Sequence, residues 1–116
     1  MTGFSIEVVH HGSQVVMVVS GELDIARADQ LAATGLLVVN SLDGDAGEVI
    51  VDLARVPSVD QAGVSALIEI RDAAIGTGRD LVLRAPRPSV SRLLAALGLD
   101  QVFLIDMTEQ STVTLS

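Results

Sequence analysis

The stretch VPSVDQAGVSAL, residues 56–67, joins a short apolar strand to the beginning of a helix. The segment before it, EVIVDL over 48–53, is apolar enough to be buried on both faces of a sheet. From Gln61 onward, apolar residues recur at steps of three and four, which predicts a helix that ends at Gly76-Thr77-Gly78. Asp60 stands at the N-cap position, where its carboxylate would accept a hydrogen bond from a first-turn amide. A strand, a turn and a capped helix in this order favour an α/β fold.

The rest of the chain alternates strand-like and helix-like segments in the same way. Two β-rich segments are separated by a turn of about four residues around Gly12, which indicates a hairpin. We expect strands at 4–9, 14–20, 48–53, 80–84 and 101–105, helices at 25–40, 61–76 and 89–97, and a weakly patterned terminal helix capped by Asp106 or Thr108. The order β-β-α-β-α-β-α-β predicts a mixed, mostly parallel sheet, because strands joined through helices run parallel and the hairpin adds one antiparallel pair.

Composition narrows the class of protein. The 116 residues fit a single domain, 1–116, and 49% are hydrophobic, which is enough for a core. The net charge of −8 argues against nucleic acid as a partner, since nucleic acid requires a basic surface. The chain has no cysteine and no lysine, which excludes disulfides, thiolate metal sites and Schiff-base chemistry. No apolar run is long enough for a membrane span and no secretory leader is present, so we expect a soluble, cytoplasmic protein.

A second strand-to-helix turn is predicted at Gly21-Glu22-Leu23-Asp24, where Asp24 can cap the helix at 25–40. If the two preceding strands are neighbours, Asp24 and Asp60 open onto the same edge of the sheet. The free amides of Gln61, Ala62 and Gly63 at this edge carry the positive end of the helix dipole, and open α/β sheets bind ligands there. Two carboxylates could serve acid–base chemistry or bind Mg²⁺, or each could simply be a helix cap.

The other clusters of chemically active residues indicate neither catalysis nor a cofactor. His10 and His11 are consecutive on a strand, so their side chains point to opposite faces and cannot readily chelate one metal ion. No serine, histidine and aspartate are spaced as a catalytic triad. Arg84, Arg87 and Arg92 form a modest basic cluster, which is either solvated charge or a contact to a partner. We therefore expect a protein that is not an enzyme and needs no cofactor.

Four motifs together resemble the STAS domain, and in particular the single-domain anti-sigma factor antagonists of bacteria. They are GELD at 21–24, VIVDL at 49–53, VDQAGV at 59–64, and LAALGLD with VF at 94–103, in the family's order and spacing over nearly the whole chain. The resemblance implies the STAS fold, which matches the element order inferred from periodicity. It also implies a protein partner, an anti-sigma factor of the serine-kinase type, whose binding frees a sigma factor.

The resemblance implies a phosphorylation switch, and this sequence departs from it. In the family, the kinase phosphorylates a Ser or Thr in an Asp-Ser-Ser/Thr-Gly turn at the start of the second helix. The family's Asp and Gly fall on Asp60 and Gly63, but the two hydroxyl positions fall on Gln61 and Ala62, which cannot accept a phosphoryl group. Ser58 and Ser65 are the nearest hydroxyls that could substitute. We expect a turn that keeps the binding geometry and has lost the switch.

The expected partner-binding surface combines the two turns with the exposed face of the helix that starts at Gln61. It comprises Glu22, Asp24, Ser58, Asp60, Gln61, Ala62, Gly63, Ser65 and Glu69. An alternative that the resemblance leaves open is a small STAS subunit of a lipid-transport ABC complex, whose partner would be an ATPase. The oligomeric state stays open.

Overall fold

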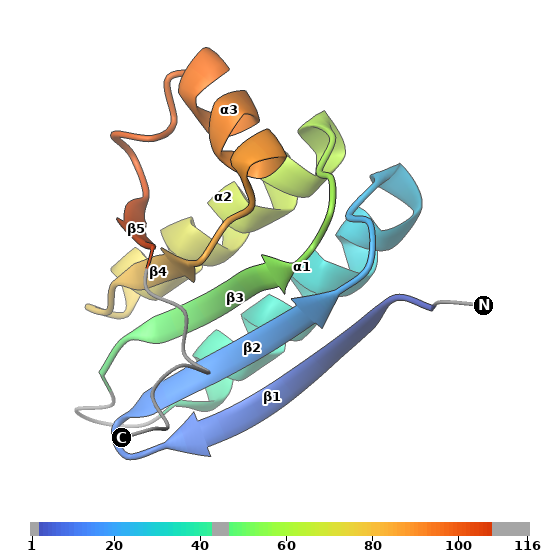
Figure 1. Ribbon diagram of the computed structural model, residues 1–116. Coiled ribbons are helices and arrows are strands. Elements are labelled where there is room, and N and C mark those ends of the chain that lie inside the picture. The colour runs from blue at the N-terminus through green and yellow to red at the C-terminus, as the bar shows by residue number, and fades with distance from the viewer. Residues whose placement is uncertain (1–2, 43–46, 108–116) are drawn as a thin grey trace, which may run out of the picture.

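A computed structural model describes residues 3–42 and 47–107 (Figure 1). The elements are β1 (Ser5–His11), β2 (Gln14–Ser20), α1 (Ile25–Ser41), β3 (Val49–Arg55), α2 (Gln61–Gly76), β4 (Leu81–Arg84), α3 (Pro88–Ala96) and β5 (Leu104–Asp106). The expected order is confirmed in this part of the chain, and the terminal helix expected after Asp106 falls outside it.

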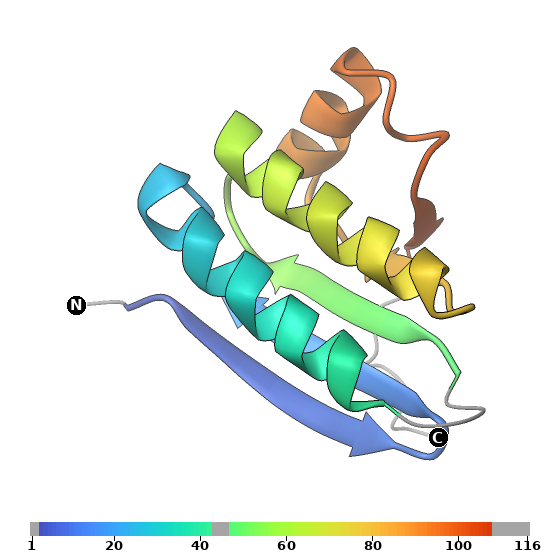
Figure 2. The same cartoon turned by 180° about the vertical axis from the view of Figure 1, so that it is seen from behind.

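The strands form one mixed sheet in the order β1-β2-β3-β4-β5. β1 and β2 are the antiparallel hairpin, and β2, β3, β4 and β5 run parallel to their neighbours. α1 and α2 lie side by side against one face of the sheet, and α3 stands next to α2 near β4 and β5 (Figure 2). Because the central strands are parallel, their carboxyl ends meet at one edge, and α1, α2 and α3 all begin from that edge.

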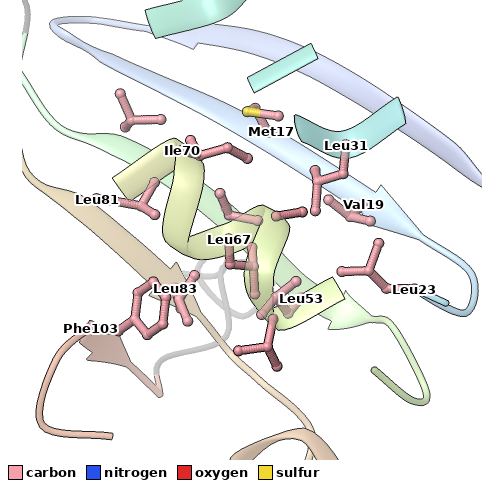
Figure 3. Close-up of a cluster of buried hydrophobic side chains, with 14 of the residues drawn as sticks. Met17, Val19, Leu23, Leu31, Leu53, Leu67, Ile70, Leu81, Leu83 and Phe103 are labelled. Carbon is pink, nitrogen blue, oxygen red and sulfur yellow. The ribbon is translucent and has the colours of Figure 1, made fainter. Parts of the chain in front are cut away.

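The main core lies between the sheet and the helices (Figure 3). Alternate residues of β2 and β3 point into it, as the two-residue period of a strand requires. Met17 and Leu53 are fully buried there against Leu67 and Ile70 of α2, and Phe103 closes the end near α3. Aliphatic side chains therefore fill nearly all of this space, which agrees with a sequence in which only 2% of the residues are aromatic.

The opposite face of the sheet carries a second, smaller cluster. Val16, Ile50 and Val82 are buried there, one from each of the three central strands. Ile50 lies between Val49 and Val51, which belong to the main core. The prediction that the strand at 48–53 is buried on both faces is therefore confirmed.

Several expected boundaries are displaced by one to three residues, and two of these differences have a local cause. The hairpin turn is only Gly12-Ser13, because Gly12 adopts a φ of +62° and lets β1 continue to His11. The last strand begins at Leu104 rather than at residue 101, since the amides of Val102 and Phe103 both donate to the carbonyl of Leu99. Phe103 enters the core from this turn, so its apolar side chain imitates a strand pattern.

The crossing of α1 and α2 depends on Gly35. This residue is buried, and a Cβ built on it would overlap the Ile70 side chain of α2. No larger residue fits unless Ile70, which is fully buried, moves to another rotamer. Gly35 therefore sets how closely the two helices pack.

We expect Gly35→Ala to lower the free energy of unfolding by about 1 kcal/mol, because overpacking of roughly 1–3 kcal/mol outweighs a helix-propensity gain of about 1 kcal/mol. Urea denaturation followed by circular dichroism measures the change. Gly76→Ala is the matched control, since nothing lies within 4 Å of a Cβ there and the same propensity gain should stabilise the protein. A Gly35→Ala variant as stable as Gly76→Ala would contradict close packing at this crossing.

Candidate partner-binding site

The two strand-to-helix turns that follow β2 and β3 are joined to each other by backbone hydrogen bonds. Leu23 and Val59 form a parallel β-bridge beyond the ends of the strands. The amide of Leu23 donates to the carbonyl of Ser58 at 3.0 Å, and the amide of Asp60 donates to the carbonyl of Leu23 at 3.2 Å. The predicted convergence of Asp24 and Asp60 on one edge of the sheet is thereby confirmed.

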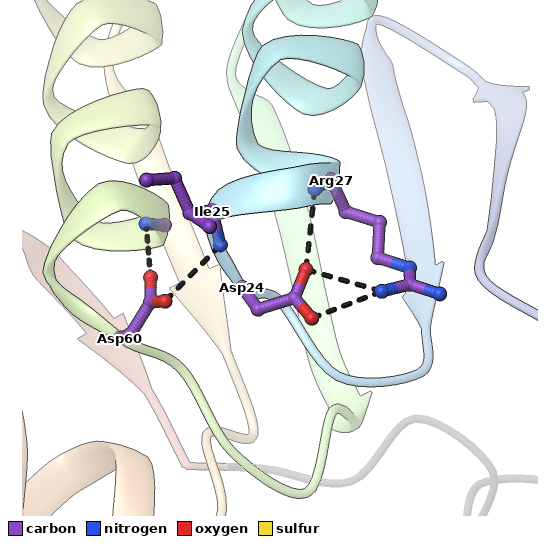
Figure 4. A network of polar contacts seen from close by, with 5 residues as sticks. Asp24, Ile25, Arg27 and Asp60 are labelled. Atoms are coloured by element: carbon purple, nitrogen blue, oxygen red, sulfur yellow. Dashed lines mark hydrogen bonds and ion pairs between the residues drawn. The ribbon is translucent and has the colours of Figure 1, made fainter.

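Asp60 holds the first turns of two helices with one carboxylate (Figure 4). Its Oδ1 accepts a hydrogen bond from the amide of Gly63 at 3.1 Å, which is the expected cap of α2. Its Oδ2 accepts one from the amide of Ile25 at 3.1 Å, the first residue of α1. The second bond spans 35 residues of sequence and was not predicted. Asp60 is therefore a cross-brace between the helices as well as a cap.

Asp24 caps α1 and is paired with Arg27. Its Oδ1 accepts from the Arg27 amide at 3.2 Å, and the Arg27 guanidinium lies 2.9 Å from Oδ2 (Figure 4). Partial burial acts to raise the pKa of Asp24, but the hydrogen bonds and the charge of Arg27 outweigh it and hold the pKa below the ordinary value of 3.8. The stabilisation from this carboxylate is therefore present above that value and is lost as the pH falls through the lowered pKa. The negative charge of Asp24 is therefore partly balanced by Arg27.

Gly63 allows the turns to approach each other closely. A Cβ at this position would lie 2.7 Å from the carbonyl oxygen of Leu23 and 2.8 Å from the Cγ of that residue. Both distances are shorter than the contacts that Cβ atoms make in proteins, so the Asp60–Gly63 turn cannot pack on Leu23 with a side chain at residue 63. Gly63 therefore lets the two turns pack against each other.

The two positions that replace the family's hydroxyls have different surroundings. Gln61 is exposed on the first turn of α2, whereas Ala62 is half-buried against the edge of the main core. Ser65 and Glu69 follow Gln61 at four-residue steps and are exposed, so they share its side of the helix. Glu22 and Ser58 are exposed on the two turns. The predicted surface residues therefore lie around one end of the molecule and along α2.

The basic cluster expected from sequence is not one cluster. Arg84 lies on the sheet and forms an ion pair with Asp52 at 2.9 Å, in which both side chains are largely buried. Arg92 is exposed on α3. Arg87, at the start of α3, instead lines one hollow together with Arg27 and Arg55, two arginines that the sequence did not single out. Only the fold brings these three together, because they are far apart along the chain.

Neither a metal site nor a spanning helix is found in the part of the chain that the structure describes. No three His, Asp or Glu side chains of residues 3–42 and 47–107 are grouped so that they could hold a metal ion. No helix within the same residues has the length and apolar character needed to cross a membrane. His10 and His11 are both exposed at the end of β1.

Fold and site together define a small mixed α/β domain with a STAS-type sheet and two braced turns at the carboxyl edge of its strands. The chain belongs to the STAS family: the model described as "Mlab, STAS domain" matches residues 6–108.

Solved structures of similar fold include proteins with several roles. An anti-sigma factor antagonist from Mycobacterium paratuberculosis is 26% identical, with a TM-score of 0.77 over 97% of this chain and 92% of the other. The Bacillus cell fate determinant SpoIIAA in its phosphorylated form is 21% identical, with a TM-score of 0.67 over 96% of each chain. A sulfate transporter family protein from Wolinella succinogenes is 20% identical, with a TM-score of 0.70 over 84% of this chain and 80% of the other.

We expect Asp60→Ala to lower the free energy of unfolding by about 2 kcal/mol, since it removes a helix cap and the bond to Ile25. Asp60→Asn should cost about half as much, because one amide oxygen can still cap α2 while the NH₂ group faces the Ile25 amide as a second donor. Denaturant unfolding and hydrogen exchange at the Ile25 amide measure both effects. Unchanged exchange at Ile25 in both variants would show that the cross-brace is absent in solution.

Proposed function

We propose that this protein is a cytoplasmic anti-sigma factor antagonist that binds an anti-sigma factor and so releases a sigma factor, without phosphorylation at residues 61 and 62. The observation that carries the proposal is the Asp60–Gly63 turn. It keeps the capping Asp and the close-packed Gly of the family's switch, and it presents Gln61 to solvent where a hydroxyl would stand. The similarity to an anti-sigma factor antagonist at 26% identity supports the same role.

The proposed partner-binding surface suits a partner with basic groups. Glu22 and Glu69 are exposed, and the whole chain carries a net charge of −8. Ile25 adds apolar area between the two turns, since 74% of its surface is exposed at the start of α1. An apolar centre with a charged rim is the usual composition of a protein–protein interface. The surface therefore offers apolar area for contact and negative charge that favours a basic partner.

The electrostatic logic of the family's switch explains why losing the hydroxyl matters. A phosphoryl group adds a charge near −2, which at an interface already holding carboxylates is repulsive and must be desolvated. Gln61 is uncharged and imitates a phosphate poorly, so the unmodified protein should be in the binding-competent state. We infer a constitutive antagonist, controlled through its abundance or through another signal.

A partner that is not a kinase would also need no hydroxyl at this turn. For that reason the alternative of a small STAS subunit in a lipid-transport ABC complex stays open. Such a subunit would co-purify with an ATPase rather than with an anti-sigma factor.

When the protein is mixed with the anti-sigma kinases of its host, we expect native mass spectrometry to show a complex that survives ATP with no phosphoryl mass added. The double variant Gln61→Ser, Ala62→Ser should gain phosphoryl mass and then dissociate, because it restores both hydroxyls. A phosphopeptide at Ser58 or Ser65 of the wild-type protein would show that the switch has moved. Binding to an ATPase of the ABC type, and to none of these kinases, would replace this proposal with the alternative.

We expect Asp24→Arg to weaken partner binding about tenfold, because reversing a charge at an interface makes the contact repulsive. Isothermal titration calorimetry measures the affinity. Asp80→Arg is the matched control, since Asp80 is exposed just before β4, at the opposite edge of the sheet. Equal affinities for the two variants would remove Asp24 from the interface.

A further inference from the structure

A hollow of about 540 Å³ opens beside the two turns, next to the proposed partner-binding surface. Its walls include Ser20, Gly21 and Glu22 at the end of β2, and three arginines. The volume is within the range of roughly 300–1,000 Å³ that is usual for small-molecule sites. It is therefore large enough for more than a single ion.

The three arginines come from three distant segments of the chain. Arg27 is in the first turn of α1, Arg55 is the last residue of β3, and Arg87 immediately precedes α3. The chain has only seven basic residues and a net charge of −8. Three of the seven line this hollow, so its lining is far richer in basic residues than the chain as a whole. Glu22 is the acidic residue among the described lining side chains, and Arg27, which also lines the hollow, is paired with Asp24.

Two of the guanidinium groups have donors to spare. Arg55 is exposed, and its side chain forms no hydrogen bond or ion pair with any other residue in 3–42 and 47–107. Arg87 donates through Nε to the carbonyl of Ala54 at 2.9 Å, which orients its guanidinium. Within the described residues that bond engages only Nε, so the two terminal nitrogens are available to a ligand. Arg27 uses one terminal nitrogen for Asp24.

The backbone that carries these side chains is held in place. The amide of Gly21 donates to the carbonyl of Arg55 at 3.0 Å, which ties the ends of β2 and β3 together. Gly21 has a φ of +105°, and a Cβ there would lie 3.1 Å from the carbonyl oxygen of Gly3. A glycine is required for this conformation, and the wall beside Arg55 is therefore formed by backbone without a side chain to fill the space.

We propose that this hollow is a binding site for a small phosphorylated molecule, whose phosphate group is held by the donors of Arg55 and Arg87 that line it together with Arg27. Guanidinium groups match phosphate oxygens in pairs and remain charged at every physiological pH, and a phosphate dianion balances several of them better than a single carboxylate does. No aromatic side chain lines the hollow, so recognition rests on the phosphate and not on stacking of a nucleobase.

The site has a regulatory consequence, which rests on the proposed function. Glu22 belongs both to the hollow and to the proposed partner-binding surface. A bound phosphate would bring negative charge to the same end of the molecule where the family adds its phosphoryl group. A reversible ligand would thus deliver the charge that Gln61 and Ala62 cannot carry.

The test uses the isolated, ¹⁵N-labelled chain, titrated at constant ionic strength with inorganic phosphate and, separately, with glucose 6-phosphate. We expect saturable NMR shifts centred on Ser20–Glu22 and on the side chains of Arg55 and Arg87. Arg55→Gln and Arg87→Gln should each weaken binding about tenfold, as expected for loss of a charged hydrogen-bond donor. Arg92→Gln removes the same charge from the exposed face of α3 and should leave the affinity unchanged.

The outcomes distinguish an organic phosphate from free phosphate as the ligand. They also test the ligand site independently of the proposed anti-sigma role. Tighter binding of the sugar phosphate would identify an organic phosphate as the ligand, and equal binding would identify free phosphate. Shifts that do not saturate, or an Arg92→Gln variant weakened as much as Arg55→Gln, would overturn the site as non-specific charge attraction. Because no partner protein is present, failure here leaves the anti-sigma proposal standing.

Discussion

The carboxylate of Asp60 is the contact on which the functional end of this molecule depends. One oxygen caps α2 and the other accepts the first amide of α1, so a single side chain satisfies donors at the start of both helices. These amides have no partner within their own helices, and the amide of Gly63, which is buried, would cost free energy if it were left unpaired. The bridge between Leu23 and Val59 and the close approach at Gly63 then follow, because both need the two turns in contact.

The fold was largely predictable from the sequence, because its signals are local. The apolar runs in 14–20 and 48–53, the helical spacing after Gln61 and the caps at Asp24 and Asp60 each depend on neighbouring residues. The errors also have local causes: a glycine with positive φ shortened the hairpin turn, and a turn amide of Phe103 displaced the last strand. The aliphatic content was sufficient to predict a core. It did not predict that Gly35 of α1 would lie against the Ile70 side chain of α2.

The candidate site was predictable only in part. The turns were found because their motifs are short and their caps obey simple rules. The bond from Ile25 to Asp60, the pairing of Arg27 with Asp24 and the meeting of Arg27, Arg55 and Arg87 were missed. The Arg27–Asp24 pair could have been predicted from spacing, because the two residues are three apart at the start of a helix. The bond from Ile25 to Asp60 and the meeting of the three arginines could be predicted only from the order of the strands in the sheet.

The residues that hold the Asp60–Gly63 turn in place differ from the residues at the family's phosphorylation positions. Within residues 3–42 and 47–107, the Asp60–Gly63 turn is held by the Asp60 carboxylate and by backbone hydrogen bonds, including those from the Asp60 amide to Leu23 and from the Val64 amide to Asp60. None of these bonds uses the side chain of residue 61 or 62. Exposed Gln61 and half-buried Ala62 can therefore replace hydroxyls without disturbing the brace. The geometry of this turn therefore does not depend on which side chains stand at residues 61 and 62. On the proposed function, a phosphate bound in the arginine-lined hollow beside Glu22 would bring negative charge to that surface without modification of Gln61 or Ala62.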